Sequence, residues 1–456
     1  MTPALILLVT FFLSTFLIIA LHHHFKETKP PLHHLPPAPF SLPVIGHLHL
    51  LSPLIHRSFH RLSSLHGPLF RLRLGSLPCI VVCTPEYAKQ FLKTNELNFS
   101  NRPDSTVINR LTYNSSFFFA PHGPFSKFMR KLATCELLAH RNTNQFLPVR
   151  NRELLCFLRA LMEKSKACEA VNVTQEIMKL TNNVISQMMF GIRFSFTKGE
   201  ADKARTLVRD VSGIFGEFNP SDLIWLLKKW DLKGIGKRGT DTPSIALEWA
   251  LAELINNPKV LKKAQEEVDN VVGRHRLVAE SDISNLPYIQ SIVKETFRLH
   301  PPIPVVTRIS AQDCIIDGYN IPAHTMLFVN VWSIGRNPKF WENPLEFQPE
   351  RFLQAGKDDP GSLLIDVKGQ HFELLPFGTG RRGCAGMSLV LQQMPTVLAA
   401  TIQCFEWKVV DPKGENIDGD GAIDMTERPG LAVPRAHDLV CMPVARIDLL
   451  DSLPDP

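Results

Sequence analysis

The sequence has no marked excess of charge of one sign, no C-x-x-C pair and no internal repeat. Over 456 residues, 50 Lys and Arg residues stand against 44 Asp and Glu residues, which gives a formal net charge of +6. So small an excess argues against a nucleic-acid-binding protein. The nine cysteines are odd in number and scattered, which argues against a disulfide framework or a structural zinc site and favours reduced thiols on the cytosolic side. With 44% apolar and 21% charged residues, the composition excludes a disordered, collagenous or polytopic membrane protein.

Two processing signals are also missing at the amino terminus. The run from Ala4 to Leu21 carries no charge and is just long enough for a membrane helix, for which the lower limit is about 17 residues. The alternative, a cleaved signal peptide, needs a positive residue before such a run and a small-x-small cleavage site after it, and the sequence has neither. We therefore predict a single transmembrane anchor over residues 1–25. Lys26 and Lys29 follow it directly, so the positive-inside tendency leaves the rest of the chain in the cytosol.

A proline-rich stretch over residues 26–46 separates this anchor from the globular part. Proline fixes φ and resists helix formation, so we predict a stiff hinge there; a disordered linker is the alternative and differs little in consequence. Residues 47–456 are then expected to form one globular domain.

Helical spacing of apolar residues dominates this globular part. The first signal is a β-hairpin formed by Leu69 to Leu74 and Cys79 to Cys83. Short strands are expected around residues 314–316 and 326–330. The predicted helices cover residues 84–93, 152–164, 174–189, 201–215, 249–256, 260–272, 286–299 and 388–405. Because helices dominate and the short strands are segregated from them, we predict a mainly α fold of the α+β class.

The most informative segment is the glycine-rich loop from Phe377 to Gly386. Its glycines let the backbone turn tightly and approach a flat ligand. Cys384 lies in this loop, beside two arginines and just before a predicted helix, a setting that favours a thiolate. From glycine and cysteine alone, a glycine-rich turn around a buried cysteine explains the segment equally well.

The full pattern F-x-x-G-x-R-x-C-x-G resembles the haem-binding loop of the haem-thiolate monooxygenases, the cytochrome P-450 family. The matching residues are Phe377, Gly380, Arg382, Cys384 and Gly386. The resemblance implies haem b as the cofactor, Cys384 as its axial thiolate and metal ligand, and Arg382 as the partner of a haem propionate. A thiolate ligand pushes electron density onto the iron and favours O–O cleavage. The resemblance also implies the family's fold, a helical domain with small β-sheets that encloses the haem.

Glu295, Arg298 and Arg351 fit the same resemblance. The first two are spaced i, i+3 on one helix face, a spacing that surface ion pairs also show. In the family, E-x-x-R is a buried structural pair, and an arginine from a Pro-Glu-Arg-Phe sequence completes it; here that arginine is Arg351. The resemblance therefore assigns all three residues to folding and to support of the haem loop.

Two more arginines resemble haem contacts of the family. Arg308 resembles a second propionate ligand, with a surface arginine as the alternative. Arg130 matches the arginine of the family's W-x-x-x-R helix, but Ser126 stands where the tryptophan would be. This departure removes an indole contact to a propionate.

Gly239 to Thr242 resembles the family's oxygen-activation segment. By this resemblance, Thr242 is the alcohol and Asp241 the acid that relay protons to dioxygen. The alternative is that Thr240 or Asp241 caps the amino end of a helix.

The resemblance runs through nearly the whole chain and fails at one place. Between Lys237 and Gly239 the family carries several dozen further residues, which include the first half of the helix that crosses the distal face of the haem. We therefore expect a shortened helix that begins within a turn of Gly239, with Arg238 near the haem pocket. Pro243 fits this shortening because proline is tolerated in a first helical turn. Such a site should be wet and should couple oxygen reduction weakly to product.

The sequence has no G-x-G-x-x-G fingerprint of a flavin or nicotinamide site after a strand. Electrons must then come from a partner, which in the microsomal class is an NADPH-dependent diflavin reductase. The same class implies the endoplasmic reticulum membrane. Basic residues near the haem loop, Lys127, Lys131 and Arg381, would suit the acidic surface of such a reductase, although they are also explained as solvated charges.

Several stretches, among them residues 366–376 and 425–431, resemble plant monooxygenases of flavonoid metabolism. This resemblance implies a small aromatic flavonoid as the substrate and oxidation of a flavanone to a flavone as the reaction. An isoflavonoid-type hydroxylation or aryl migration is the alternative. A further alternative is that the chain is an inactive product of truncation or mis-splicing, because a segment is missing.

Overall fold

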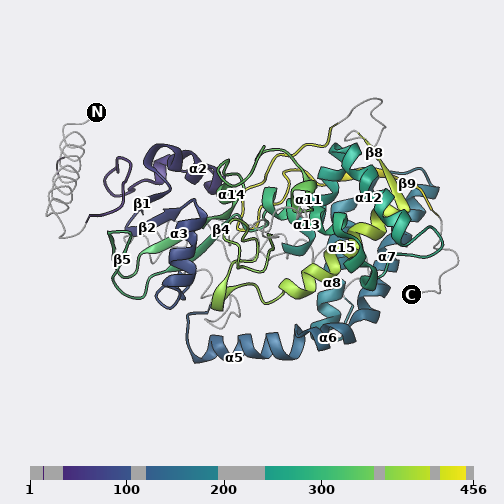
Figure 1. Ribbon diagram of the computed structural model, residues 1–456, viewed down its shortest axis with the longest axis horizontal. Coiled ribbons are helices and arrows are strands. Elements are labelled where there is room, and N and C mark those ends of the chain that lie inside the picture. Colours follow the sequence, from purple (N-terminus) through teal and green to yellow (C-terminus); the bar gives the residue numbers. More distant parts are fainter. Residues whose placement is uncertain are drawn as a thin grey trace, which may run out of the picture. The chain divides into compact units, whose positions relative to one another are not determined.

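The computed structural model describes residues 14, 34–103, 120–193, 242–353, 365–410 and 422–447 (Figure 1). The predicted anchor apart from Ser14, residues 26–33 of the predicted hinge, the helix predicted at residues 201–215, Arg238 and Asp241 lie outside the described residues. Within the described ranges, no helix combines the length and the apolar character that crossing a membrane requires.

Helices make up most of the regular secondary structure of the described chain. The α-helices are α2 (Ile55–His66), α3 (Pro85–Lys89), α5 (Pro124–Leu132), α6 (His140–Gln145), α7 (Leu147–Lys166), α8 (Val173–Phe190), α11 (Thr242–Asn256), α12 (Pro258–Val271), α13 (Pro287–Leu299), α14 (Val331–Ile334) and α15 (Met387–Cys404). Short 3-10 turns are η1 (Leu48–Leu50), η5 (Glu280–Asn285), η6 (Pro349–Phe352) and η7 (Gly380–Arg382), and two turns of π-helix are η2 (Gln90–Thr94) and η3 (Ala133–Leu137).

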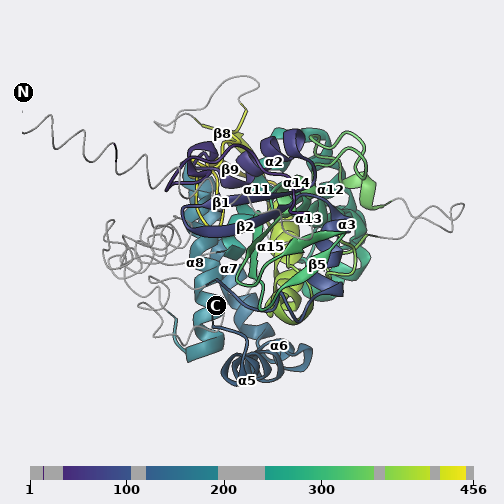
Figure 2. The ribbon, with the colours of Figure 1, turned by 90° about the vertical axis from the view of Figure 1, so that its left-hand side faces the viewer.

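The strands form three small sheets. They are β1 (Leu69–Leu74), β2 (Leu77–Val82), β3 (Val171–Asn172), β4 (Val305–Ile309), β5 (Cys314–Ile316), β6 (Tyr319–Ile321), β7 (Met326–Asn330), β8 (Phe405–Val409) and β9 (Val440–Ala445). The largest sheet has the order β1-β2-β7-β4; β1 and β2 form an antiparallel hairpin (Figure 2) with Leu69 opposite Val82, and β2 runs parallel to β7. The other sheets are β3-β9-β8 and the hairpin β5-β6. The predicted hairpin and the mainly α fold with small sheets are confirmed.

The described residues fall into two compact units. The first contains the described residues below 107 and residues 307–330, and so it holds α2, α3, most of the largest sheet and the β5-β6 hairpin. The second contains the other described residues, with α5 to α8, α11 to α15 and the β3-β9-β8 sheet. Within it α7 and α8 lie side by side (Figure 2).

α11 is the most deeply buried helix of the predicted site. It packs against α8, α13 and α15 (Figure 1), and its side chains from Ser244 to Leu254 are all buried. This stretch includes the carboxyl groups of Glu248 and Glu253. Because burying a carboxylate without partners is costly, both groups must find partners inside the second unit.

α13 shows how the sequence sets helix boundaries. Pro287 occupies the first helical position, where its missing N–H costs nothing. Ile289, Ile292 and Val293 recur at helical spacing and are buried. The helix ends before His300 because the following Pro301 disfavours the helical conformation of the residue that precedes it.

Glu248 on α11 is held in a buried polar contact. The Thr174 hydroxyl donates to its Oε1 at 2.9 Å, and Nη1 of Arg435 lies 3.5 Å from the same oxygen. Burial raises the pKa of Glu248 to about 7, although the charge of Arg435 and the hydrogen bond from Thr174 oppose this shift.

The free energy of unfolding is therefore expected to fall as the pH rises toward 7. A carboxyl group whose folded pKa lies above its unfolded value of about 4.3 binds more protons in the folded state between those two values, and this contribution is lost as the pH rises through the folded pKa. The substitution Glu248→Gln, which cannot ionise, should flatten this slope and raise the stability above pH 7 by up to about 3 kcal/mol. Urea unfolding over a series of pH values measures the slope, and an unchanged slope in the variant would contradict this account.

Candidate functional site

The loop from Phe377 to Gly386 closes on itself immediately before α15. The N–H of Cys384 donates to the carbonyl of Phe377 at 2.8 Å, and the N–H of Gly383 donates to the carbonyl of Gly380 at 2.9 Å. Gly380 has a φ of 65°, in the left-handed region that glycine adopts without strain. The loop thus places Cys384 three residues before the start of α15 at Met387.

The thiol of Cys384 is exposed. Protein atoms still surround it closely enough for burial to raise its pKa, while the N–H groups of Gly386 and Met387 and the guanidinium of Arg130 act in the opposite direction. On its own, this thiol holds its proton more strongly than an ordinary cysteine. A bound metal ion would remove that proton, because a coordinating thiol is deprotonated outright.

Two arginines hold main-chain carbonyls at the loop, Arg130 from outside it and Arg382 from within it. Arg130, on α5, donates from Nη2 to the carbonyl of Gly383 at 2.6 Å, and the buried Arg382 donates from Nη2 to the carbonyl of Ala120 at 2.8 Å. Burial lowers the pKa of both side chains, and the charge of Arg130 lowers the pKa of Arg382 further. Two partly desolvated cations beside an exposed thiol suit a ligand that carries both anionic groups and a metal ion.

Phe377 attaches the loop to α13. Its ring meets the ring of Phe297 edge-on, with 5.0 Å between the centroids and an angle of 66°. Gly386, at the other end of the loop, is less constrained: an added Cβ would meet only the sulfur of Cys384, at 3.9 Å, which is an ordinary contact.

Gly369 and Thr379 also support the loop, and the sequence analysis did not assign them a role. The Thr379 hydroxyl donates to the carbonyl of Gly369 at 2.7 Å. Gly369 has a φ of 81°, and an added Cβ there would lie 2.7 Å from the carbonyl oxygen of Gly378. The sequence could have pointed to Gly369 as a glycine shortly before the loop. Its contact with the Gly378 carbonyl, however, depends on the fold and cannot be found from the sequence.

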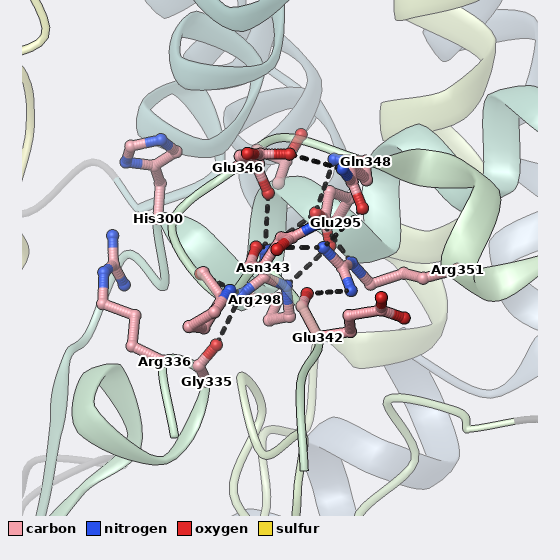
Figure 3. A network of polar contacts seen from close by, with 12 residues as sticks. Glu295, Arg298, His300, Gly335, Arg336, Glu342, Asn343, Glu346, Gln348 and Arg351 are labelled. Atoms are coloured by element: carbon pink, nitrogen blue, oxygen red, sulfur yellow. Dashed lines mark hydrogen bonds and ion pairs between the residues drawn. The ribbon is translucent and has the colours of Figure 1, made fainter. Parts of the chain in front are cut away.

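Glu295 and Arg298 form a fully buried ion pair on α13 (Figure 3). The Nε of Arg298 donates to Oε2 of Glu295 at 2.7 Å, and Nη2 donates to Oε1 at 2.8 Å. The other N–H groups of Arg298 donate to main-chain carbonyls at 2.6 to 2.9 Å; these belong to Gly335, Pro344 and Glu346.

Arg351 joins this pair from η6. Its Nε donates to Oε1 of Glu295 at 3.1 Å, and the N–H of Gln348 donates to the same oxygen at 2.8 Å (Figure 3). Nη1 of Arg351 also donates to the carbonyl of Glu342 at 2.9 Å. The structure thus brings Glu295, Arg298 and Arg351 into one network on the helix that also contacts Phe377.

The remaining predicted site residues are placed less completely. Arg308 lies on β4 in the other unit, where it is buried and donates from Nη1 to the carbonyl of Thr307 at 2.8 Å; its contact to a propionate stays a prediction. Thr242 is the first residue of α11 and Pro243 lies in the first turn. Asp241, Gly239 and Arg238 are outside the described residues.

Ser126, at the position of the family's tryptophan, serves the start of α5. Its hydroxyl accepts from the N–H of Gly123 at 3.0 Å and donates to the carbonyl of the same residue at 3.1 Å. The side chain is buried. The serine therefore satisfies a backbone donor at the helix start in place of an aromatic contact.

The family model of cytochrome P450 matches residues 36–238 and 237–432 of the chain. The chain belongs to the cytochrome P450 family. It is 49% identical to Cytochrome P450 93B2 of Gerbera hybrida, over 92% of this chain and 93% of the relative. It is 43% identical to 3,9-dihydroxypterocarpan 6A-monooxygenase of Glycine max (93% and 95% covered) and 42% identical to 2-hydroxyisoflavanone synthase of Glycyrrhiza uralensis (96% and 98%). These similarities identify a plant cytochrome P450 monooxygenase.

The match to the cytochrome P450 model breaks at residues 237–238. This is the place where the sequence pattern predicts a missing segment. The alignment with the Gerbera relative agrees, since it runs over 487 positions, more than the 456 residues of the chain, and yet covers only 92% of the chain. Positions of the relative therefore have no counterpart here.

The cytochrome P450 family implies haem iron, and the described loop fits it. Cys384 would offer an exposed sulfur to the iron, and Arg130 and Arg382 would offer partly desolvated cations to the carboxylates of the haem. When bound, the haem would activate dioxygen, and electron density from the thiolate would favour cleavage of the O–O bond.

The substitution Arg130→Met is expected to weaken haem binding by this cytochrome P450 about tenfold, the effect of losing one charge-assisted hydrogen bond. It removes both a charge beside the site and the donor that holds the Gly383 carbonyl next to Cys384. Titration of haem into the haem-free protein, followed by absorbance, measures the affinity. Lys131→Met is the matched control, because Lys131 is an exposed cation on the same helix. Equal loss in both variants would refute a specific role for Arg130.

Proposed function

We propose that this chain oxidises a flavonoid at a haem held by Cys384, using dioxygen and electrons that NADPH provides through a separate reductase. The exposed thiol of Cys384, in a loop that contains Arg382 and is contacted by Arg130, carries the proposal. A structural cysteine gains nothing from exposure or from two neighbouring cations, whereas an axial ligand of a haem with anionic propionates requires both.

The similar proteins support an isoflavonoid-type reaction better than the flavanone-to-flavone oxidation predicted from the sequence. Two of the reported relatives carry names that state a product or substrate, a 2-hydroxyisoflavanone and a pterocarpan. We therefore place hydroxylation or aryl migration on a flavonoid skeleton first, and flavone formation second.

In this proposal the protein binds the haem, orients it and delivers protons. Cys384 would ligate the iron, and we propose that the cations of Arg382, Arg130 and Arg308 pair with the haem carboxylates, as the resemblance to the family implies. Phe377, Gly380 and Gly386 shape the loop. The Thr242 hydroxyl and the Asp241 carboxyl relay protons from solvent to the distal side, since an alcohol next to an acid can pass a proton on without a net change of charge.

The proposed partner is an NADPH-dependent cytochrome P450 reductase. Lys127, Lys131 and Arg381 are exposed, and positive charges of this kind speed the encounter with an acidic surface. Together with the predicted anchor over residues 1–25, this partner places the chain on the endoplasmic reticulum membrane with its catalytic domain in the cytosol.

Microsomes that contain the chain, the reductase and a flavanone such as naringenin test the proposed reaction. A carbon monoxide difference spectrum first establishes that the haem is bound through a thiolate. A 2-hydroxyisoflavanone product supports the proposal, and a flavone would move the assignment to the second reaction. Bound haem without any flavonoid product would refute both and favour the inactive, truncated product.

The same incubations test the effect of the missing segment. Peroxide released per NADPH consumed reports how poorly oxygen reduction is coupled to product. We expect a high ratio in the native chain and a lower one after the segment of a full-length relative is inserted between Lys237 and Arg238. A native chain that already releases little peroxide would contradict the proposed wet distal pocket.

A further inference from the structure

His300 links α13 to α11 through two different contacts. Its ring stacks on Trp249, with 4.1 Å between the centroids and 6° between the planes. Its Nε2 lies 2.7 Å from Oε1 of Glu253. Trp249 and Glu253 are one turn apart on α11, so one imidazole at the end of α13 engages two successive turns of that helix.

The hydrogen bond has a defined direction. Only 9% of the His300 side chain is exposed, and within the described residues its Nδ1 has no hydrogen-bond partner. Burial lowers the pKa of His300; Glu253 and Glu427 oppose this shift, while Arg336 adds to it. The ring is therefore neutral, with its proton on Nε2 donated to Glu253, because protonation of Nδ1 would bury an N–H without an acceptor.

Thr242 lies on the same face of α11 as this contact. Trp249 and Glu253 follow it by 7 and 11 positions, which are about two and three turns of a helix with 3.6 residues per turn. A contact that fixes Trp249 and Glu253 therefore also fixes the rotation of α11 about its axis at the Thr242 position.

The same helix end is tied to the Cys384 loop. Phe297 on α13 contacts Phe377 at the start of the loop, and Arg298 anchors α13 to the segment from Gly335 to Glu346. In Figure 3, His300 lies at the edge of this network, beside Arg336. α13 thus holds the loop through one residue and α11 through another, three positions away.

We propose that His300 is a positioning residue of the monooxygenase reaction, which fixes the rotation of α11 so that the Thr242 position keeps a constant register with the Cys384 loop. The inference rests on the proposed proton-relay role of Thr242. His300 itself does not touch the reacting atoms in this account; it acts through Trp249 and Glu253.

Two substitutions at one position separate the contacts. His300→Phe keeps an aromatic ring to stack on Trp249 but removes the donor to Glu253. His300→Gln retains an N–H that can reach Glu253. Tyr288→Phe is the matched control, because it removes a donor to another carboxylate, Glu350, which lies 2.9 Å away, from the other end of α13.

Hydrogen exchange in the haem-free protein gives a readout that needs no catalysis. Amides of α11 should exchange about tenfold faster in His300→Phe than in the native chain, as expected for a buried carboxylate that loses the donor to Oε1 and keeps only the Asn257 side chain at Oε2 among the described residues. They should stay near the native rate in His300→Gln and in Tyr288→Phe. Equal exchange in His300→Phe and the native chain would overturn the proposed tie between the helices.

The ratio of peroxide to NADPH tests the positioning role in the haem-loaded protein. His300→Phe should retain the thiolate-type carbon monoxide spectrum and raise this ratio about threefold, with rescue in His300→Gln. The double variant His300→Phe/Thr242→Ala should be no worse than Thr242→Ala, because two residues that act through one group are not additive. Additive effects would overturn the positioning role. No effect of Thr242→Ala alone would refute the proposed function of Thr242, while the exchange result would still report on the contact of His300.

Discussion

The substitution Arg298→Met should lower the free energy of unfolding by about 3–5 kcal/mol, the cost of breaking a buried ion pair and leaving one charge behind. Arg298 is the centre of its network: it provides two hydrogen bonds to Glu295 and three to main-chain carbonyls. Without it, the fully buried carboxylate of Glu295 keeps, among the described residues, only Arg351 and one backbone N–H from Gln348. A loss of this size is a large part of the stability of an ordinary domain, which is about 5–15 kcal/mol.

Urea unfolding of the purified chain, together with the yield of soluble protein, measures this loss. Arg276→Met is the control, because Arg276 is also paired with a carboxylate, at 2.6 Å from Asp282, but its side chain is 52% exposed. Exposed pairs are worth about 1 kcal/mol or less. If the two substitutions cost the same, the network around Glu295 does not hold the fold together.

The substitution Cys384→Ser is expected to abolish the thiolate-type, red-shifted carbon monoxide spectrum and all monooxygenase activity, with little effect on folding. The thiol is exposed, so it adds little to packing. The main-chain bond from Cys384 to Phe377 does not involve the side chain and should survive. A serine hydroxyl cannot replace the thiolate as a source of electron density to the iron.

The ferrous carbon monoxide spectrum and an unfolding curve of the same sample separate the two effects. Cys135→Ser serves as the control, since Cys135 is also exposed but lies in η3, outside the loop. A red-shifted band that persisted in Cys384→Ser would mean that another cysteine ligates the iron.

Local sequence patterns predict the helices and strands in which buried apolar residues recur at a regular spacing. The hairpin at Leu69 and the helix α13 were predicted within a residue or two, because their apolar positions recur at the period of a strand or a helix and because Pro301 marks the end of α13. α2 was not predicted: of its buried residues only Phe59 and Leu62 are apolar, and His56 and Ser58 make up the rest. Strands β8 and β9 were also missed, since they are stabilised by pairing with distant segments.

The same distinction applies to the site. The ten-residue loop around Cys384 is local and its pattern is specific, so it was found from the sequence. The acceptors of Arg130 and Arg382, which are the carbonyls of Gly383 and Ala120, depend on segments far apart in the chain. The contact between His300 and α11 also joins segments far apart in the chain, and a histidine before two prolines gives no sign of it in the sequence.

The contacts of α13 with both the Cys384 loop and α11 have a thermodynamic consequence. Because this helix contacts the Cys384 loop through Phe297 and α11 through His300, any ligand that stabilises the loop also stabilises the arrangement of α11. Coupling of this kind is reciprocal. Haem binding should therefore slow amide exchange in α11, and substitutions in α11 that increase its order should tighten haem binding. The fraction of the chain that holds haem could thus be measured from the hydrogen-exchange protection of the amides of α11, although this helix contributes no ligand to the iron.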